Sequence, residues 1–249
     1  MTAPDSPNRP LATLTLFGYN SARAKAWAFG QMGLAGRTIA KNEGLRFFKL
    51  LGSGSGGGFS LQPDFARYGL LCAWQDEQSA DEFFKNSDIM QQFRSRAHEV
   101  WTVKLAAIKS HGNWSGQNPF APTIENYDAA KPIAVLTRAT ISFKKLKRFW
   151  NFVPETSREI NNANGLIRSI GIGEAPFFRQ ATFSFWQNET AMRDFAYKSP
   201  VHKEVVKLTR AENWYKEELF ARFVPISSAG TWNGRDPLDG LLPQTETRT

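Results

Sequence analysis

Three histidines and one cysteine limit the metal chemistry open to this chain, and His202 has the most suggestive setting. In Ser199-Pro200-Val201-His202-Lys203, the serine suits a helix N-cap and the proline suits the first helical position. The positive end of a helix dipole disfavours imidazolium, and a metal ion requires a neutral imidazole. His202 is therefore predicted to be a metal ligand; the alternative is a partly buried histidine that donates a hydrogen bond to a carbonyl.

The other potential ligands are less well placed. His98 lies near an expected helix end, and His111 near an expected strand end. Cys72 lies between apolar neighbours in an expected strand, which favours a buried structural thiol over a thiolate ligand. The sequence has neither H-x-x-x-H nor C-x-x-C spacing, which argues against zinc and non-haem iron. A cofactor that needs one protein ligand, such as haem, is compatible.

Three arginines of the second half are candidate site residues. Arg138 lies within the strand-like run Leu136–Thr140, where a charge needs a partner. We predict that it is catalytic, pairing with a cofactor carboxylate or polarising bound oxygen. Arg168 and Arg179 are predicted to bind the cofactor. Each of the three could instead be a strand-edge arginine in solvent or part of an internal ion pair, and both interpretations stay open.

The chain contains an internal repeat. Trp74-Gln75-Asp76-Glu77 matches Trp186-Gln187-Asn188-Glu189 at an offset of 186 − 74 = 112, and Met90 is then the counterpart of His202. Each half closes on a similar segment, Trp114-Ser115-Gly116 in the first and Trp232-Asn233-Gly234 in the second. The predicted domains are a repeat over 11–116, a polar linker over 117–131 and a second repeat over 132–237.

Hydrophobic periodicity predicts strand, helix, strand, strand, helices and strand in each half. This order predicts the α+β class, with two tandem ferredoxin-like units forming an intramolecular dimeric α+β barrel around a dry cavity. Pro154 is expected to end or kink a helix, and the tail after Pro237 is expected to fray. The Gly-rich loop 52–59 is either a flexible lid or a long hairpin connection. Strands are expected at 11–17, 45–51, 67–74, 101–108, 133–139, 165–172, 180–186 and 214–224.

Composition narrows the class further. Hydrophobic residues make up 41% of the 249, and the net charge is +8. No run approaches the ~20 apolar residues of a membrane span, and the N-terminus lacks a signal-peptide core, so a cytoplasmic protein is expected. The basic residues are scattered and no recognition motif is present, which argues against nucleic acid. A solvated basic surface, or attraction to anionic lipid or cofactor carboxylates, fits the charge.

Several segments together resemble the spheroidene monooxygenase family. They are Trp27-Ala28-Phe29-Gly30-Gln31-Met32-Gly33, Lys49-Leu50-Leu51-Gly52-Ser53-Gly54, Thr137-Arg138-Ala139-Thr140-Ile141 and Ser199-Pro200-Val201-His202. The likeness extends from about Leu11 to Pro237, and the first and third segments are the most specific.

The resemblance implies an oxygenase that places keto groups on acyclic carotenoids, using molecular oxygen and reduced ferredoxin, with haem as cofactor. His202 is carried over as the axial iron ligand by analogy with haem proteins of the same barrel type. Alternatives are a haem-dependent dehydratase or peroxidase of that barrel type, or a haem-binding protein without turnover. Peripheral membrane association and a homodimer are left open.

Overall fold

The computed structural model describes residues 9–55, 60, 62–175 and 177–242, without the side chains of 201 and 202. The strands occur where the periodicity predicts them, most of them longer by a few residues. They are β1 (Leu11–Gly18), β2 (Leu45–Gly54), β3 (Pro63–Trp74), β4 (Glu99–Gly112), β5 (Ile133–Ile141), β6 (Leu166–Ala175), β7 (Arg179–Trp186) and β8 (Tyr215–Gly230). Residues 56–59 of the predicted lid or hairpin connection lie outside the described residues.

Helices follow the strands in each half. They are α1 (Ala22–Leu34), α2 (Gly36–Ile39), α3 (Glu77–Asn86), α4 (Asp88–Arg96), the 3-10 turn η2 (Phe143–Lys145), α5 (Leu146–Asn161), α6 (Glu189–Lys198) and α7 (Pro200–Glu212). Asp76 and Asn188, at matched positions of the repeat, are N-caps that accept backbone N–H groups at the starts of α3 and α6. Helix α5 continues through Pro154, so the expectation that the helix ends there is wrong, and a kink stays a prediction. Its apolar stripe, including Phe149 and Val153, packs in one cluster with Trp214 and stabilises the helix across the proline.

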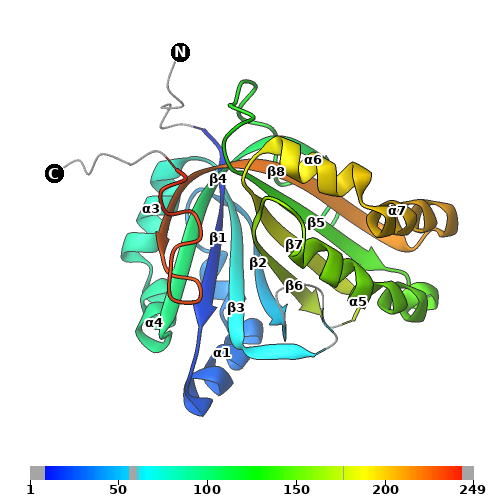
Figure 1. Cartoon of the computed structure of the whole chain (residues 1–249). Coiled ribbons are helices and arrows are strands. Elements are labelled where there is room, and N and C mark those ends of the chain that lie inside the picture. Colours follow the sequence, from blue (N-terminus) through cyan, green and yellow to red (C-terminus); the bar gives the residue numbers. More distant parts are fainter. Residues whose placement is uncertain (1–8, 56–59, 61, 176, 243–249) are drawn as a thin grey trace.

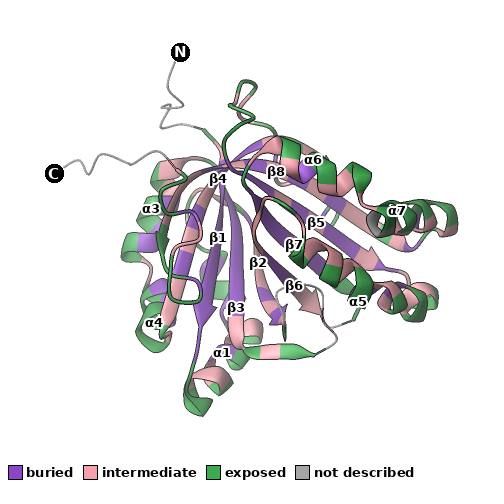
Figure 2. Ribbon diagram, viewed as in Figure 1, coloured by how far each residue is buried: buried purple, intermediate pink, exposed green. Residues whose placement is uncertain are grey.

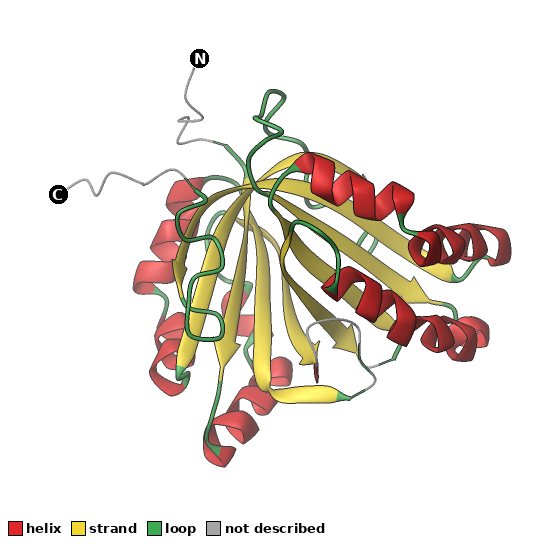
Figure 3. Cartoon of the chain, viewed as in Figure 1, coloured by secondary structure: helices red, strands yellow, loops and turns green. Residues whose placement is uncertain are grey.

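The eight strands close into an antiparallel barrel in the order β1-β3-β2-β6-β7-β5-β8-β4, with the helices outside (Figures 1 and 3). Strand order is β4-β1-β3-β2 in the first half and β8-β5-β7-β6 in the second. The halves meet along β4 and β8, from Trp101 opposite Gly230 to Gly112 opposite Leu219. The other seam joins β2 to β6 through two residue pairs. The α+β barrel is thus confirmed; separate ferredoxin-like units with the boundaries given above stay a prediction.

The inside of the barrel is filled by side chains, so the dry cavity predicted there is wrong. Alternate residues of every strand point inward and form one buried cluster that includes Leu14, Trp101, Leu136 and Phe183. Figure 2 shows the strands as the buried layer of the molecule. Leu238 belongs to this cluster, so the chain beyond Pro237 does not fray at once as expected. A planar cofactor inside the barrel would have to displace these side chains, which turns attention to the helix-covered outer face.

Candidate functional site

Strand pairing aligns the two halves residue by residue. Leu11 of β1 lies opposite Trp74 of β3, and Ile133 of β5 lies opposite Trp186 of β7. Positions in β1 therefore match those in β5 at an offset of 133 − 11 = 122. Positions in β3 match those in β7 at 186 − 74 = 112, the offset seen in the sequence repeat. This alignment makes the helix-facing surfaces of the two sheets directly comparable.

The helix-facing surface of the second half carries small and polar side chains where the first half has large ones. Phe17, which stacks on Phe93 with ring centroids 5.0 Å apart, is matched by Ala139. Leu70 is matched by Thr182. The substitution reduces the volume of side chains between this sheet and its helices, because the same backbone positions carry fewer atoms. The matched pairs in which the second half has the smaller or more polar residue are Phe17 and Ala139, Phe48 and Ser169, Leu50 and Gly171, Tyr68 and Gln180, Leu70 and Thr182, and Cys72 and Ser184.

The packing of the two helix layers differs accordingly. In the first half, one continuous buried cluster joins the sheet to its helices and includes Phe17, Leu70 and Met90. In the second half, the described residues form two separate clusters, one around Trp214 and one around Trp186. The Thr182 hydroxyl is buried and has no hydrogen-bond partner among the described residues. A buried hydroxyl left unpaired is costly, so this surface is suited to a further group that the chain does not itself supply.

Helix α7, whose Val205 and Leu208 pack in the cluster around Trp214, contains His202, as predicted. The side chain of His202 lies outside the described residues. At the matched position of α4, Met90 is fully buried against the first sheet. The helix before each of these ends at a serine, Ser87 or Ser199, in extended conformation. The backbone conformation before the helix that contains Met90 is therefore repeated before the helix that contains position 202.

Arg138 lies on the other face of β5, inside one end of the barrel, and is 3% exposed. Its guanidinium pairs with Glu217 and lies 3.5 Å from Oε2 of Glu174. Glu174 also accepts from Lys49 Nζ at 2.7 Å and from Trp114 Nε1 at 2.6 Å. The internal ion pair, one of the two interpretations of this arginine, is thus present. Its catalytic role stays a prediction.

The electrostatics of this network hold both carboxylates ionised. Burial raises the pKa of Glu174, but hydrogen bonds from Lys49 and Trp114 and the nearby charges outweigh it, so the net pKa is lowered. Burial also acts on Glu217, and the backbone N–H of Gly116 together with Arg138 lowers its pKa. The network contains two cations, Lys49 and Arg138, and two carboxylates, Glu174 and Glu217. Its charges therefore balance at this end of the barrel.

The structure does not bring Arg168 and Arg179 together. They lie near opposite ends of the β6–β7 pair, where Arg168 is opposite Phe185 and Arg179 is opposite Ala175. Six residues along β7 correspond to about 20 Å at the usual rise of a strand. Arg179 is exposed and its guanidinium lies 5.9 Å from the Phe178 ring.

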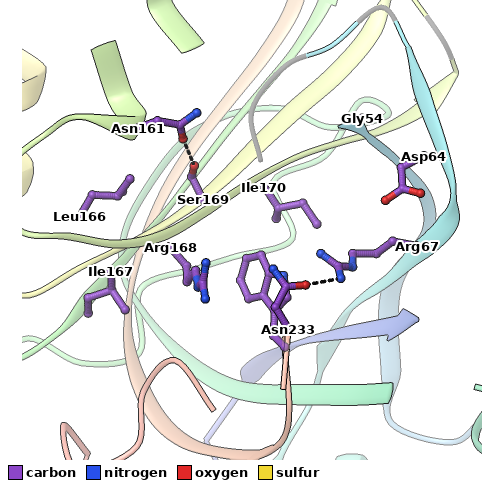
Figure 4. Close-up of a pocket in the computed structure, with 11 residues that line it drawn as sticks. Gly54, Asp64, Arg67, Asn161, Leu166, Ile167, Arg168, Ser169, Ile170 and Asn233 are labelled. Carbon is purple, nitrogen blue, oxygen red and sulfur yellow. Dashed lines mark hydrogen bonds between the residues drawn. The ribbon is translucent and has the colours of Figure 1, made fainter. Parts of the chain in front are cut away.

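Arg168 lines a cavity of about 460 Å³ at the short β2–β6 seam. Figure 4 shows its guanidinium beside Asn233, which accepts a hydrogen bond from Arg67 Nη2 at 2.6 Å. On the far side of the same cavity, the Ser169 hydroxyl donates to Asn161 at 3.3 Å. Asp64 also lines the cavity. The cofactor-binding roles predicted for Arg168 and Arg179 remain predictions.

The remaining candidate ligands are Cys72, His111 and His98, of which His98 is exposed. Cys72 is fully buried in the first helix layer, and burial raises the pKa of its thiol well above the usual range. The His111 ring packs on Phe220 with centroids 5.4 Å apart. Over the described residues, no group of three or more His, Cys, Asp or Glu side chains could hold a metal ion. In the same part of the chain, no helix is both long and apolar enough to cross a membrane.

The fold and the two unequal helix layers define a closed α+β barrel protein with a candidate site in its second half. The chain resembles the crystal structure of an aldoxime dehydratase in complex with butyraldoxime, with a TM-score of 0.59 and 10% identity over 89% of this chain and 81% of that one. A second aldoxime dehydratase structure gives a TM-score of 0.57 and 12% identity over 89% and 83%. At this identity the likeness is one of fold.

Sequence comparison identifies the family: the chain belongs to the spheroidene monooxygenases. It is 38% identical to the enzyme of Cereibacter sphaeroides over 231 residues, which is 92% of this chain and 71% of that protein. It is 34% identical to the Rhodobacter capsulatus enzyme over 96% of this chain and 99% of the relative. The Rubrivivax gelatinosus enzyme is 38% identical over 85% and 81%. No family model matches the chain.

Sequence reasoning predicted a ligand at His202 but missed the small and polar side chains on the helix-facing surface of the second sheet. Residues such as Ala139, Thr182 and Gly171 carry no motif and look ordinary within their strands. The available signal was the repeat itself, because aligning the halves shows the replacement of Phe17, Leu70 and Leu50 by smaller residues.

Proposed function

We propose that this protein is a haem-dependent monooxygenase that introduces keto groups into an acyclic carotenoid, with molecular oxygen and reduced ferredoxin as co-substrates. The names of the three relatives support a monooxygenase acting on spheroidene or a similar polyene. A hydrocarbon polyene offers no charge or hydrogen-bonding group, so its recognition rests on apolar shape and on the placement of the reacting carbon. Haem would supply the oxygen activation, which amino-acid side chains do not provide.

The observation that supports this proposal most strongly is the surface beneath α5 and α7, where the second half has smaller side chains than the first half at matched positions. Ala139 and Thr182 replace Phe17 and Leu70, and Gly171 replaces Leu50. A planar group needs such a flat, shallow floor, and the unpaired Thr182 hydroxyl offers it a polar contact. We propose that His202 holds the iron from α7, on the strength of the inward direction of Met90 at the matched helix position.

The chain's own contribution would then be binding, orientation and exclusion of water. The clusters around Trp214 and Trp186 flank the proposed site on both sides and keep its margins apolar. A hydrogen bond from the Thr182 hydroxyl would orient a polar atom of the bound group at the floor. Because Arg138 lies on the opposite face of β5, its predicted role in the reaction would be indirect: its ion-pair network would hold the strand rigid beneath the proposed site.

The proposal is tested by producing the protein in a host that makes acyclic carotenoids and analysing the pigments. Wild type should yield keto carotenoids, and His202→Ala should yield none. His111→Ala is the matched control, since His111 is an exposed histidine on β4, and it should retain the wild-type product pattern. Product from His202→Ala at the wild-type level would refute the assignment. Haem binding without any product would indicate a non-catalytic haem protein instead.

A further inference from the structure

An exposed group of aromatic rings lies at one edge of the second half, where β5 ends and β7 begins. Phe143 is 75% exposed and Phe177 is 49% exposed. The Phe143 and Phe178 rings are in contact, with centroids 6.4 Å apart. Backbone pairing of Ile141 N with Phe178 O at 2.7 Å brings the two segments together. We call Phe143, Trp150, Phe177 and Phe178 the aromatic edge.

The conformation of Phe177 is unusual for an aromatic residue. Its φ of 74° lies in the left-handed region, which is unfavourable for a bulky side chain. The Trp150 indole N–H donates to the Phe177 carbonyl at 3.0 Å and fixes this geometry. A glycine would adopt the same backbone at no steric cost. Phe177 thus occupies a strained backbone position with about half of its surface in solvent.

Basic side chains surround the aromatic edge. Lys144, Lys147 and Arg179 are exposed and have no carboxylate partner within the described part of the chain. Lys145 and Arg148 both pair with Glu212, at 3.5 and 2.6 Å. Hydrogen bonds from Arg148 and Trp214, with the nearby positive charges, lower the pKa of Glu212 to about 2. Five cations against one carboxylate give this edge a strong positive potential around an apolar centre.

Exposed phenylalanine and tryptophan within a ring of lysine and arginine is the chemistry that recognises a membrane interface. The rings enter the boundary between headgroups and acyl chains, and the cations contact anionic headgroups. We propose that the aromatic edge is a peripheral docking site for a bilayer that contains anionic phospholipid. The 3-10 turn η2 and the first turn of α5 carry four of these cations and belong to the helix layer over the proposed active site, so docking would place that site next to the membrane.

The inference rests on the proposed function in one respect, the apolar substrate, which would be dissolved in the bilayer. Charge complementarity favours the membrane over a second copy of this basic chain, because two such edges would repel each other. An acidic protein is the other candidate partner of the aromatic edge. The vesicle experiment below separates it from the membrane.

The experiment is co-sedimentation of the full chain with vesicles of phosphatidylcholine alone and of phosphatidylcholine with phosphatidylglycerol. Wild type should bind the anionic vesicles and lose most of that binding in 0.5 M salt, about fifteen-fold or more. Phe177→Gly removes the ring and suits the left-handed backbone, so folding is preserved. Phe177→Gly and Phe143→Ser should each weaken partitioning of the protein into the anionic vesicles about ten-fold. Phe29→Ser, at a 60% exposed phenylalanine of α1, is the matched control and should bind as wild type.

The charged ring is tested in the same way. Lys144→Gln with Lys147→Gln should weaken binding about twenty-fold, as expected for about five-fold per lysine. The control pair is Lys41→Gln with Lys85→Gln, both exposed on the first half, and it should have little effect. Absence of wild-type binding to anionic vesicles, or equal loss in Phe29→Ser, would overturn the docking site. Loss of self-association in the edge variants without any vesicle binding would assign the surface to a protein partner instead.

Activity toward two forms of substrate separates this proposal from the proposed function. Turnover of a carotenoid embedded in vesicles should fall in Phe143→Ser and Phe177→Gly, whereas turnover in detergent micelles should match wild type. Activity in micelles without vesicle binding would refute the docking site and leave the enzyme assignment intact. Vesicle binding without turnover of either form of substrate would support the docking site and refute the enzyme assignment.

Discussion

Restoring the side chains of the first half to the second tests whether there is room beneath α5 and α7. The variant is Ala139→Phe combined with Thr182→Leu, which introduces the residues found at Phe17 and Leu70. Replacing Thr182 removes a buried hydroxyl without a partner, which contributes about 1–3 kcal/mol. Burying a phenylalanine ring contributes about 1.5–3 kcal/mol when space exists for it. Because the introduced side chains will not fill the space perfectly, part of this gain is lost. We expect the ligand-free variant to be about 2–4 kcal/mol more stable than wild type.

The assay is urea unfolding of ligand-free protein, followed by tryptophan fluorescence, together with haem titration. With a slope of about 3 kcal/mol per molar, the midpoint should rise by about 1 M. The same variant should fail to take up haem at concentrations that saturate wild type. Phe17→Ala is the reverse control: this ring is 1% exposed, and its removal should cost about 3–5 kcal/mol.

The opposite sign would refute the reasoning. If other side chains already fill the surface, the two larger residues overpack it and destabilise the protein by about 1–3 kcal/mol. Unchanged haem uptake by a stably folded double variant would move the binding site elsewhere, whatever the stability result.

Three further predictions concern the rest of the fold. Arg138→Ala should lower the free energy of unfolding by about 3–5 kcal/mol in urea titrations, because it leaves Glu217 without its cation and Glu174 with Lys49 alone; a loss below about 1 kcal/mol would contradict a stabilising role for this network. Glu174 has a lowered pKa when folded, so its contribution to stability is present above about pH 4.5 and is lost as the pH falls below that value. Glu174→Gln should therefore lose less stability than wild type between pH 5 and 3, and parallel curves would count against this. Cys72 should react with a thiol reagent at the rate of global unfolding, and fast labelling of the native protein would contradict its burial.

Much of the fold could be predicted from local patterns, since alternation identifies the strands and the repeat identifies the two halves. The caps Asp76 and Asn188 were visible for the same reason, because capping depends on neighbouring residues. Barrel closure was inferred from the duplication, but the filling of its interior was not. The inward residues are distributed over eight strands, and their volumes must be summed in three dimensions.

For the candidate site, too, features that depend on neighbouring residues could be predicted and long-range contacts could not. The environment of Arg138 could not be predicted, because Lys49 and Glu174 are separated by 125 positions and meet through strand pairing at the β2–β6 seam. The sequence offered an internal ion pair as an alternative without identifying the partners. The distance between Arg168 and Arg179 likewise follows from the register of β6 and β7. The passage of α5 through Pro154 reflects tertiary packing that outweighs a local preference.

The most direct test of the central claim is the absorption spectrum of purified protein titrated with haem. Wild type and His111→Ala should show a saturable Soret band at one haem per chain, and His202→Gly should show none until imidazole is added. Recovery of the band by imidazole would assign the missing ligand to the His202 side chain. A Soret band in His202→Gly identical to that of wild type, without imidazole, would contradict the account.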